Sequence, residues 1–146
     1  MKTFLKLFYL VPVLVVLGIV ASLVWNRSKP PPLHVLSGPP FASAPITNLT
    51  ANLFTPEGRL GPAANDVFIE FRDAAGKLVD VGDVQFELRL ETPGAITHCV
   101  SKVLRTSTPG QYRANVAPQI VGQWTAKLSF ARPGAQAQAN FLLTVK

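Results

Sequence analysis

The chain has 146 residues, which suits one ordinary domain and a short appendage. Its net charge of +6 is mostly local, because from Pro30 onward 10 basic and 8 acidic residues leave a balance of only +2. These charges form no basic stripe of the kind that phosphate backbones require, so nucleic-acid binding is not expected.

The first predicted element is a membrane-spanning helix, within a single-pass anchor that we assign to residues 1–27. From Phe8 to Trp25 there is no charged side chain, and including Leu7 gives 19 residues. That length is sufficient to cross the hydrocarbon core of a bilayer as a helix. Tyr9 and Trp25 lie near the ends of the run, where aromatic rings favour the headgroup level.

A cleaved signal peptide is the alternative interpretation of this segment. Lys2 and Lys6 would supply its basic region, and the small residues Ala21–Ser22 would supply a weak cleavage site. The apolar run is longer than the roughly 7–15 residues usual for a signal peptide. Arg27 and Lys29 come after it as a stop-transfer signal, which favours an uncleaved anchor.

The orientation of the anchor depends on its flanks. Two lysines precede the run and two basic residues come after it, so the positive-inside rule is nearly balanced. The α-amino group and the short N-terminal tail favour export of the C-terminal part of the chain. We therefore predict a single-pass protein of a bacterial cytoplasmic membrane with its C-terminal domain in the periplasm or extracytoplasmic space.

Residues 28–46 are predicted to be a proline-rich linker. They hold six of the thirteen prolines and one charged residue. Consecutive prolines favour an extended, semi-rigid polyproline II spacer. Alternatively, Leu33–Leu36 begins an edge strand, since proline is tolerated at sheet edges.

From Thr47 onward the sequence predicts an all-β domain over residues 47–146. Val84, Phe86, Leu88 and Leu90 alternate strictly with polar residues, as in a half-buried strand. No segment after residue 30 has helical periodicity, and short strands at this spacing predict an antiparallel β-sandwich. The other predicted strands are 47–54, 66–73, 96–106, 112–116, 122–130 and 137–146. The large inward residues assigned to the core are Phe71, Phe86, Tyr112, Trp124, Phe130 and Phe141.

Several segments of this domain resemble the YtkA-like / FixH family. They are Pro109–Tyr112 (PGQY), Gly122–Trp124 (GQW), the terminal strand Phe141–Val145, and Asp66–Asp80 (DVFIEFRDAAGKLVD). The resemblance covers residues 47–146 and implies a membrane-anchored, immunoglobulin-like extracytoplasmic domain. Some members of the family are associated with copper handling or with assembly of copper-containing respiratory oxidases.

His98 and Cys99 form the candidate metal site. Typical members of the family carry Met and His between the third and fourth strands, whereas the segment here, ETPGAITHCV, has His98 and no methionine. Imidazole with thiolate suits Cu(I) or Zn²⁺. Adjacent strand residues point to opposite faces, so the two side chains share one ion only at a bulge or a strand end. His34, about 60 residues earlier, would have to fold back to join them.

The alternative for this pair is structural. Cys99 then acts as a small buried hydrophobe and His98 as a surface residue. As the single cysteine, Cys99 also has the option of a disulfide between two chains.

The acidic residues are a weaker candidate site. Asp66, Glu70 and Asp73 lie near one strand, and Asp80 and Asp83 near the next. Clustered carboxylates bind Ca²⁺ at the ends of some sandwiches, but this spacing matches no calcium-loop motif and solvated turn acids are far commoner.

Catalysis is not expected. The chain has two histidines, and no serine lies in a nucleophile-elbow pattern. The sequence therefore predicts a non-enzymatic, membrane-anchored accessory or assembly protein that acts by protein contacts with a membrane complex and uses no cofactor. The alternative is a copper-handling module using His98 and Cys99.

Overall fold

The computed structural model describes Leu36 and residues 38–93, 95–132 and 135–146 of the chain. They belong to a compact unit that runs from His34 to Lys146. The predicted anchor, residues 1–27, lies outside the described residues, and so does the first part of the predicted linker. No helix among the described residues has the length and apolar character needed to span a bilayer.

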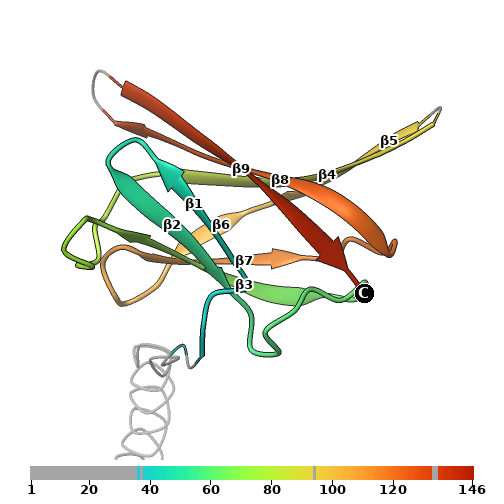
Figure 1. The fold of residues 1–146 in the computed structure, drawn as a ribbon, viewed down its shortest axis with the longest axis horizontal. Coiled ribbons are helices and arrows are strands. Elements are labelled where there is room, and N and C mark those ends of the chain that lie inside the picture. The colour runs from blue at the N-terminus through green and yellow to red at the C-terminus, as the bar shows by residue number, and fades with distance from the viewer. Residues whose placement is uncertain (1–35, 37, 94, 133–134) are drawn as a thin grey trace, which may run out of the picture. The chain divides into compact units, whose positions relative to one another are not determined.

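The described residues form nine strands in two antiparallel sheets (Figure 1). Sheet A has the order β1-β2-β3-β7-β6 and sheet B the order β5-β4-β8-β9. The predicted all-β fold with two antiparallel sheets is thus confirmed. The strands are β1 (Ala42–Ile46), β2 (Leu49–Phe54), β3 (Asn65–Arg72), β4 (Val84–Thr92), β5 (Ala95–Ser101), β6 (Val103–Arg105), β7 (Gln111–Val116), β8 (Gly122–Arg132) and β9 (Ala135–Val145).

The core between the sheets contains the six aromatic residues assigned to it from the sequence. Phe71 lies at its centre, with its ring edge-to-face against Tyr112 at 5.6 Å and against Phe130 at 5.2 Å between centroids. Burying each large apolar side chain contributes roughly 1.5–3 kcal/mol, so this cluster is a main source of stability. All six are buried: Phe71, Phe86, Tyr112, Trp124, Phe130 and Phe141.

The sandwich begins earlier than the predicted boundary at Thr47. Within the stretch assigned to the linker, β1 pairs with β2 from Ala42 opposite Leu53 to Ile46 opposite Leu49. Pro45 is accommodated because β1 is the edge strand of sheet A, where a missing N–H is tolerated. Thr47 turns the hairpin in a left-handed conformation, with φ of 58°.

The single strand predicted over residues 96–106 is two strands in different sheets. β5 belongs to sheet B and β6 to sheet A, and only Lys102 separates them. The crossing is held by Ser101, whose hydroxyl donates a hydrogen bond of 2.7 Å to the carbonyl oxygen of Asn115. This change of sheet leaves β5 as an edge strand of sheet B.

Candidate functional site

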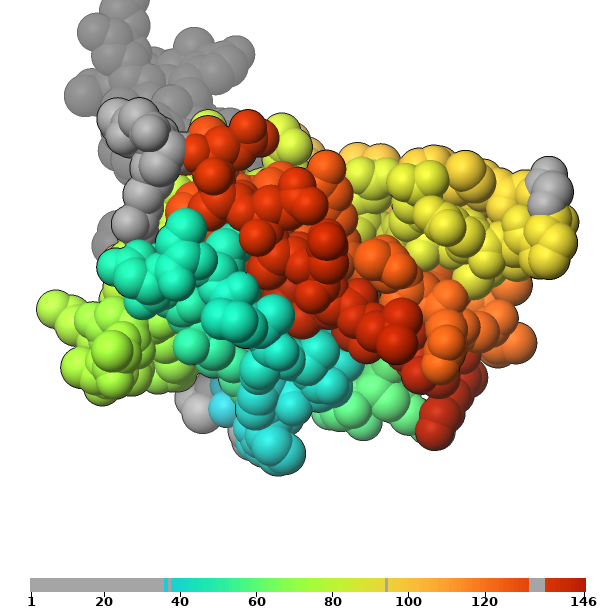
Figure 2. Space-filling view, turned by 45° about the horizontal axis from the view of Figure 1, so that its top comes forward, coloured from blue at the N-terminus to red at the C-terminus, as the bar shows by residue number. Residues whose placement is uncertain are grey.

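The β4–β5 hairpin projects from the side of the sandwich. It pairs from Phe86 opposite Ser101 to Thr92 opposite Ala95. Both strands run outward together in the ribbon view (Figure 1), and the yellow lobe in the space-filling view is this hairpin (Figure 2). β4 is held in the sheet by β8 on its other side, whereas β5 is an edge strand. The hairpin therefore presents a free edge of sheet B on β5.

The polarity of β5 is inverted relative to an ordinary half-buried strand. Its inward positions, opposite buried residues of β4, are the small or polar Thr97, Cys99 and Ser101. Its outward positions carry two apolar side chains, Ile96 at 54% exposure and Val100 at 77%. Apolar side chains normally face the core of an antiparallel sheet, so this strand turns its hydrophobic side to solvent.

The charged side chains around this strand are paired within the hairpin. His98 lies between Ile96 and Val100 in the outward row, and its Nδ1 is 2.6 Å from Oε1 of Glu87 on β4. On the same face of β4, Nε of Arg89 is 3.0 Å from Oε1 of Glu91. We call the exposed side chains of Ile96, His98 and Val100 the outward β5 face. It combines two apolar residues with a polar centre that is hydrogen-bonded to Glu87.

His98 and Cys99 lie on opposite faces of β5. His98 is exposed and contacts Glu87, whereas Cys99 is half-buried and packs against the core. Each face thus receives one soft ligand, and the pair does not converge on a single point. No group of three or more His, Cys, Asp or Glu residues suited to hold a metal ion occurs among the described residues. His34, which would have to fold back to join them, lies outside the described residues.

A cleft of about 560 Å³ lies where the chain crosses from sheet B to sheet A. Its lining combines apolar side chains with charged side chains of both signs. The sequence gives no sign of it, because the crossing at Lys102 has no glycine or proline to mark it. Its lining includes Phe86, Val100, Val103 and Tyr112, together with Lys102, Arg105, Lys127, Asp83 and Glu87.

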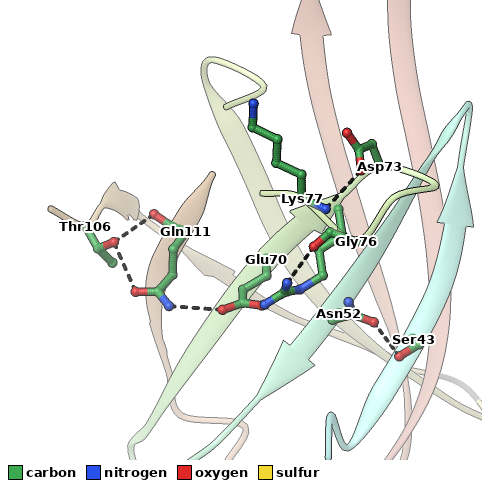
Figure 3. Close-up of polar contacts among 9 residues, drawn as sticks. Ser43, Asn52, Glu70, Asp73, Gly76, Lys77, Thr106 and Gln111 are labelled. Atoms are coloured by element: carbon green, nitrogen blue, oxygen red, sulfur yellow. Dashed lines mark hydrogen bonds and ion pairs between the residues drawn. The ribbon is translucent and has the colours of Figure 1, made fainter. Parts of the chain in front are cut away.

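Glu70 belongs to a buried polar network on the outer side of sheet A (Figure 3). Its carboxylate, with the residue only 4% exposed, accepts hydrogen bonds from Nε and Nη2 of Arg72 at 3.0 and 2.7 Å. Nε2 of Gln111 donates to its other oxygen at 3.1 Å, which ties β3 to β7. The hydroxyl of Thr106 donates to Oε1 of Gln111 at 3.2 Å. The network is a structural tie between neighbouring strands.

Two of the other acidic residues singled out as calcium candidates, Asp66 and Asp73, also have structural partners. Asp66 accepts hydrogen bonds from Arg113 and Asn115 of β7. Asp73 accepts the backbone N–H groups of Ala75 and Lys77, closing the turn that contains Gly76. These carboxylates stabilise strands and turns.

Tyr112 uses its hydroxyl to join β7 to the loop before β4. The hydroxyl donates to Oδ1 of Asp80 at 2.7 Å and accepts the N–H of Val81 at 3.0 Å. Burial away from water, reinforced by the hydrogen bond to Asp80, raises the pKa of Tyr112 to about 12. Gly110 precedes it with φ of 83°, and a Cβ there would lie 2.7 Å from the backbone nitrogen of Val79. The Pro-Gly-x-Tyr segment thus serves packing.

Comparison with known proteins identifies no relative of this chain. No family model, curated protein or solved structure matches this chain.

Proposed function

We propose that this protein is a non-enzymatic interaction module that binds a protein partner through the outward β5 face. In this proposal, the domain is an immunoglobulin-like sandwich of the YtkA-like / FixH kind. The N-terminal segment tethers it to a bacterial cytoplasmic membrane, with the sandwich on the extracytoplasmic side. It serves as an accessory or assembly factor of a membrane complex.

The observation that carries the proposal is the inverted polarity of β5. Keeping Ile96 and Val100 in water costs free energy that a protein partner would recover, at roughly 25 cal/mol for each Å² of apolar surface covered. The neighbouring polar groups already have partners, Glu87 with His98 and Arg89 with Glu91, so covering the face leaves few polar groups without a partner. Apolar side chains together with polar groups that already have partners are common in protein interfaces.

The projection of the hairpin supports the same interpretation. A partner reaches both the outward side chains and the free edge of β5 without moving another strand of sheet B. Leu142 offers a contrast within the same sheet. It is 72% exposed on β9, but its neighbour across the pair is the polar Thr125. A single exposed leucine is ordinary, whereas two apolar residues on an accessible edge strand form a patch.

The proposal is tested by site-specific photocrosslinking of the full chain in the membranes of the cells that produce it. A photoreactive residue at position 100 is expected to give a discrete adduct with another protein. The same residue at position 142 serves as the matched control and is expected to give none. Ile96→Asp should abolish the adduct from position 100. Equal adducts from both positions, or none from position 100, would refute the proposal.

Metal delivery through His98 is the competing function, and a Cu(I) titration separates the two. If the protein acts by contacts alone, wild type and His98→Ala show the same weak, non-saturating response. Saturable binding that is lost in both His98→Ala and Cys99→Ser would instead favour the metal module.

A further inference from the structure

The two sheets have four edge strands, and three of them are protected against pairing with another chain. β1 carries Pro45, which cannot donate a ladder hydrogen bond. β6 is only three residues long. β9 has β1 packed beside it, and its last residue, Val145, forms a bridge with Leu60. Short strands, prolines and coverage are the devices by which natural sheets avoid edge-to-edge association.

β5 has none of these protections. It is seven residues long, Ala95–Ser101, and contains no proline and no Lys, Arg, Asp or Glu. Among the described residues, no strand pairs with the edge of β5 that faces away from β4. Its free backbone N–H and C=O groups therefore form a template that only another extended strand matches fully.

We propose that two copies of this chain pair through their β5 strands, antiparallel, with His98 opposite His98 on the twofold axis. A twofold axis perpendicular to the sheet relates two antiparallel strands and keeps the side chains of paired residues on the same face. The residue that lies on the axis is then opposite its own copy. His98 is the midpoint of β5, so this register pairs all seven residues. The two four-stranded sheets then become one continuous sheet of eight strands.

The side chains of β5 are compatible with this register. On the outward face, Ile96 of one copy lies opposite Val100 of the other, which places apolar beside apolar twice. On the inward face, Thr97 lies opposite Cys99, and neither is charged. Each His98 keeps its hydrogen bond to Glu87 of its own copy, so each of the facing imidazoles retains a polar partner.

The ends of the paired strands are complementary in charge. Lys102 is exposed and comes directly after β5. Glu91 is exposed and flanks Ile96 in the β4–β5 register. Because Ile96 of the second copy lies opposite Val100 of the first, Lys102 and Glu91 of the second copy are offset by two strands and two residues, roughly 12 Å at Cα. Opposite charges at this separation attract one another at both ends of the paired strands.

Pairing also doubles the apolar patch, and in this respect the inference rests on the proposed function. Ile96 and Val100 of both copies come together around the axis on one face of the joined sheet. A partner would then contact four apolar side chains in place of two. The edge pairing itself does not require such a partner.

The test is disulfide trapping in the full chain in its membrane, using a mild thiol oxidant. The variant His98→Cys with Cys99→Ser places cysteines opposite each other, roughly 4.5–5.5 Å apart at Cα. This is within the range of a disulfide, so we expect a covalent dimer. In wild type, the two Cys99 residues lie diagonally, roughly 7–8 Å apart, and should trap at least tenfold less. Leu142→Cys with Cys99→Ser is the exposed control and should remain monomeric.

The controls make each outcome decisive. Fluorescence of Trp124, which is buried, checks that each variant of the unit His34–Lys146 is folded, and a surface change at His98 is not expected to unfold it. Absence of the His98→Cys dimer, or equal trapping at Leu142→Cys, overturns the inference. Trapping through wild-type Cys99 in place of position 98 overturns the register. A heterologous photoadduct from position 100 without a trapped dimer would refute self-pairing and leave the proposed function standing.

Discussion

Tyr112 offers the sharpest test of the fold, because one hydroxyl satisfies two groups in the loop before β4. Replacing Tyr112 with Phe keeps the ring beside Phe71 but removes the acceptor for the N–H of Val81 and the donor to Asp80. Val81 is buried, so its N–H is left without a partner in the interior. An unsatisfied buried polar group costs about 1–3 kcal/mol, which lowers the melting temperature by roughly 4–12 °C in a domain of this size.

The same substitution should change how stability depends on pH. The folded pKa of Tyr112 is raised to about 12, above the unfolded value of about 10. The folded state therefore keeps the phenolic proton at pH values where the unfolded state has lost it. The resulting stabilisation is fully present below about pH 10 and is lost as the pH rises through about 12, with a total of about 3 kcal/mol.

The unit His34–Lys146 suits the assay, since it contains the described core, Tyr112 is its single tyrosine and Trp124 its single tryptophan. Denaturant unfolding monitored by the fluorescence of Trp124 gives the free energy of unfolding of wild type and Tyr112→Phe at each pH. Phenolate absorbance titrates Tyr112 directly. We expect the difference between the two proteins to shrink from about pH 10 to pH 12. A constant difference, or a phenolic pKa near 10 in the folded protein, would refute the reasoning.

Two further substitutions test the packing of the sandwich and the polar network. Gly110→Ala should lower the free energy of unfolding by about 3 kcal/mol or more, because φ is 83° and the new Cβ would lie 2.7 Å from the backbone nitrogen of Val79. Gly76→Ala is the control, with φ of 79° and open space around the Cβ, and should cost about 1 kcal/mol. Denaturant unfolding compares the two variants, and equal losses of stability would contradict the predicted clash. Glu70→Gln should lower the free energy of unfolding by about 1–3 kcal/mol, because it weakens the charge-assisted hydrogen bonds to Arg72. The control Glu57→Gln, at an exposed residue, should change it by no more than about 0.5 kcal/mol. Thermal unfolding measures both effects. A neutral Glu70→Gln would show that the network contributes no net stability.

The parts of the fold that could be predicted from the sequence are those where alternation has strong contrast. In β4, Phe86, Leu88 and Leu90 alternate with polar residues, and all three are buried as expected. β1 lacks this contrast, since its inward positions include small alanines and it contains Pro45. It therefore resembled a linker, although pairing with β2 places it in sheet A.

Features that depend on tertiary structure could not be predicted in this way. The crossing at Lys102 has no turn residue, and its hydrogen bond joins Ser101 to Asn115 on another strand. Glu70 was singled out only as a weak calcium candidate, yet it is buried among partners on β3 and β7. The Glu-x-Arg spacing, which places both side chains on one face of the strand, is the sequence signal for the ion pair. Tyr112 was expected in the core, but the partners of its hydroxyl lie more than thirty residues earlier in the chain.

The candidate site was partly predictable. Strand alternation alone placed His98 and Cys99 on opposite faces, and the structure has one exposed and the other packed against the core. The sequence also shows that apolar Ile96 and Val100 share one face of β5 with His98, and that Thr97 and Cys99 share the other. Which of the two faces is buried could be determined only from the register with β4. That register made the apolar residues, rather than the histidine and cysteine, the defining feature of the face.

The single-residue joint at Lys102 has a mechanical consequence. The backbone at Lys102 connects β5 of one sheet directly to β6 of the other. Ser101 also binds this connection to the backbone of β7 by its hydrogen bond to Asn115. The hairpin therefore has no hinge at its base on this side. Tension applied to its tip by a bound protein would therefore be carried through the backbone into both sheets.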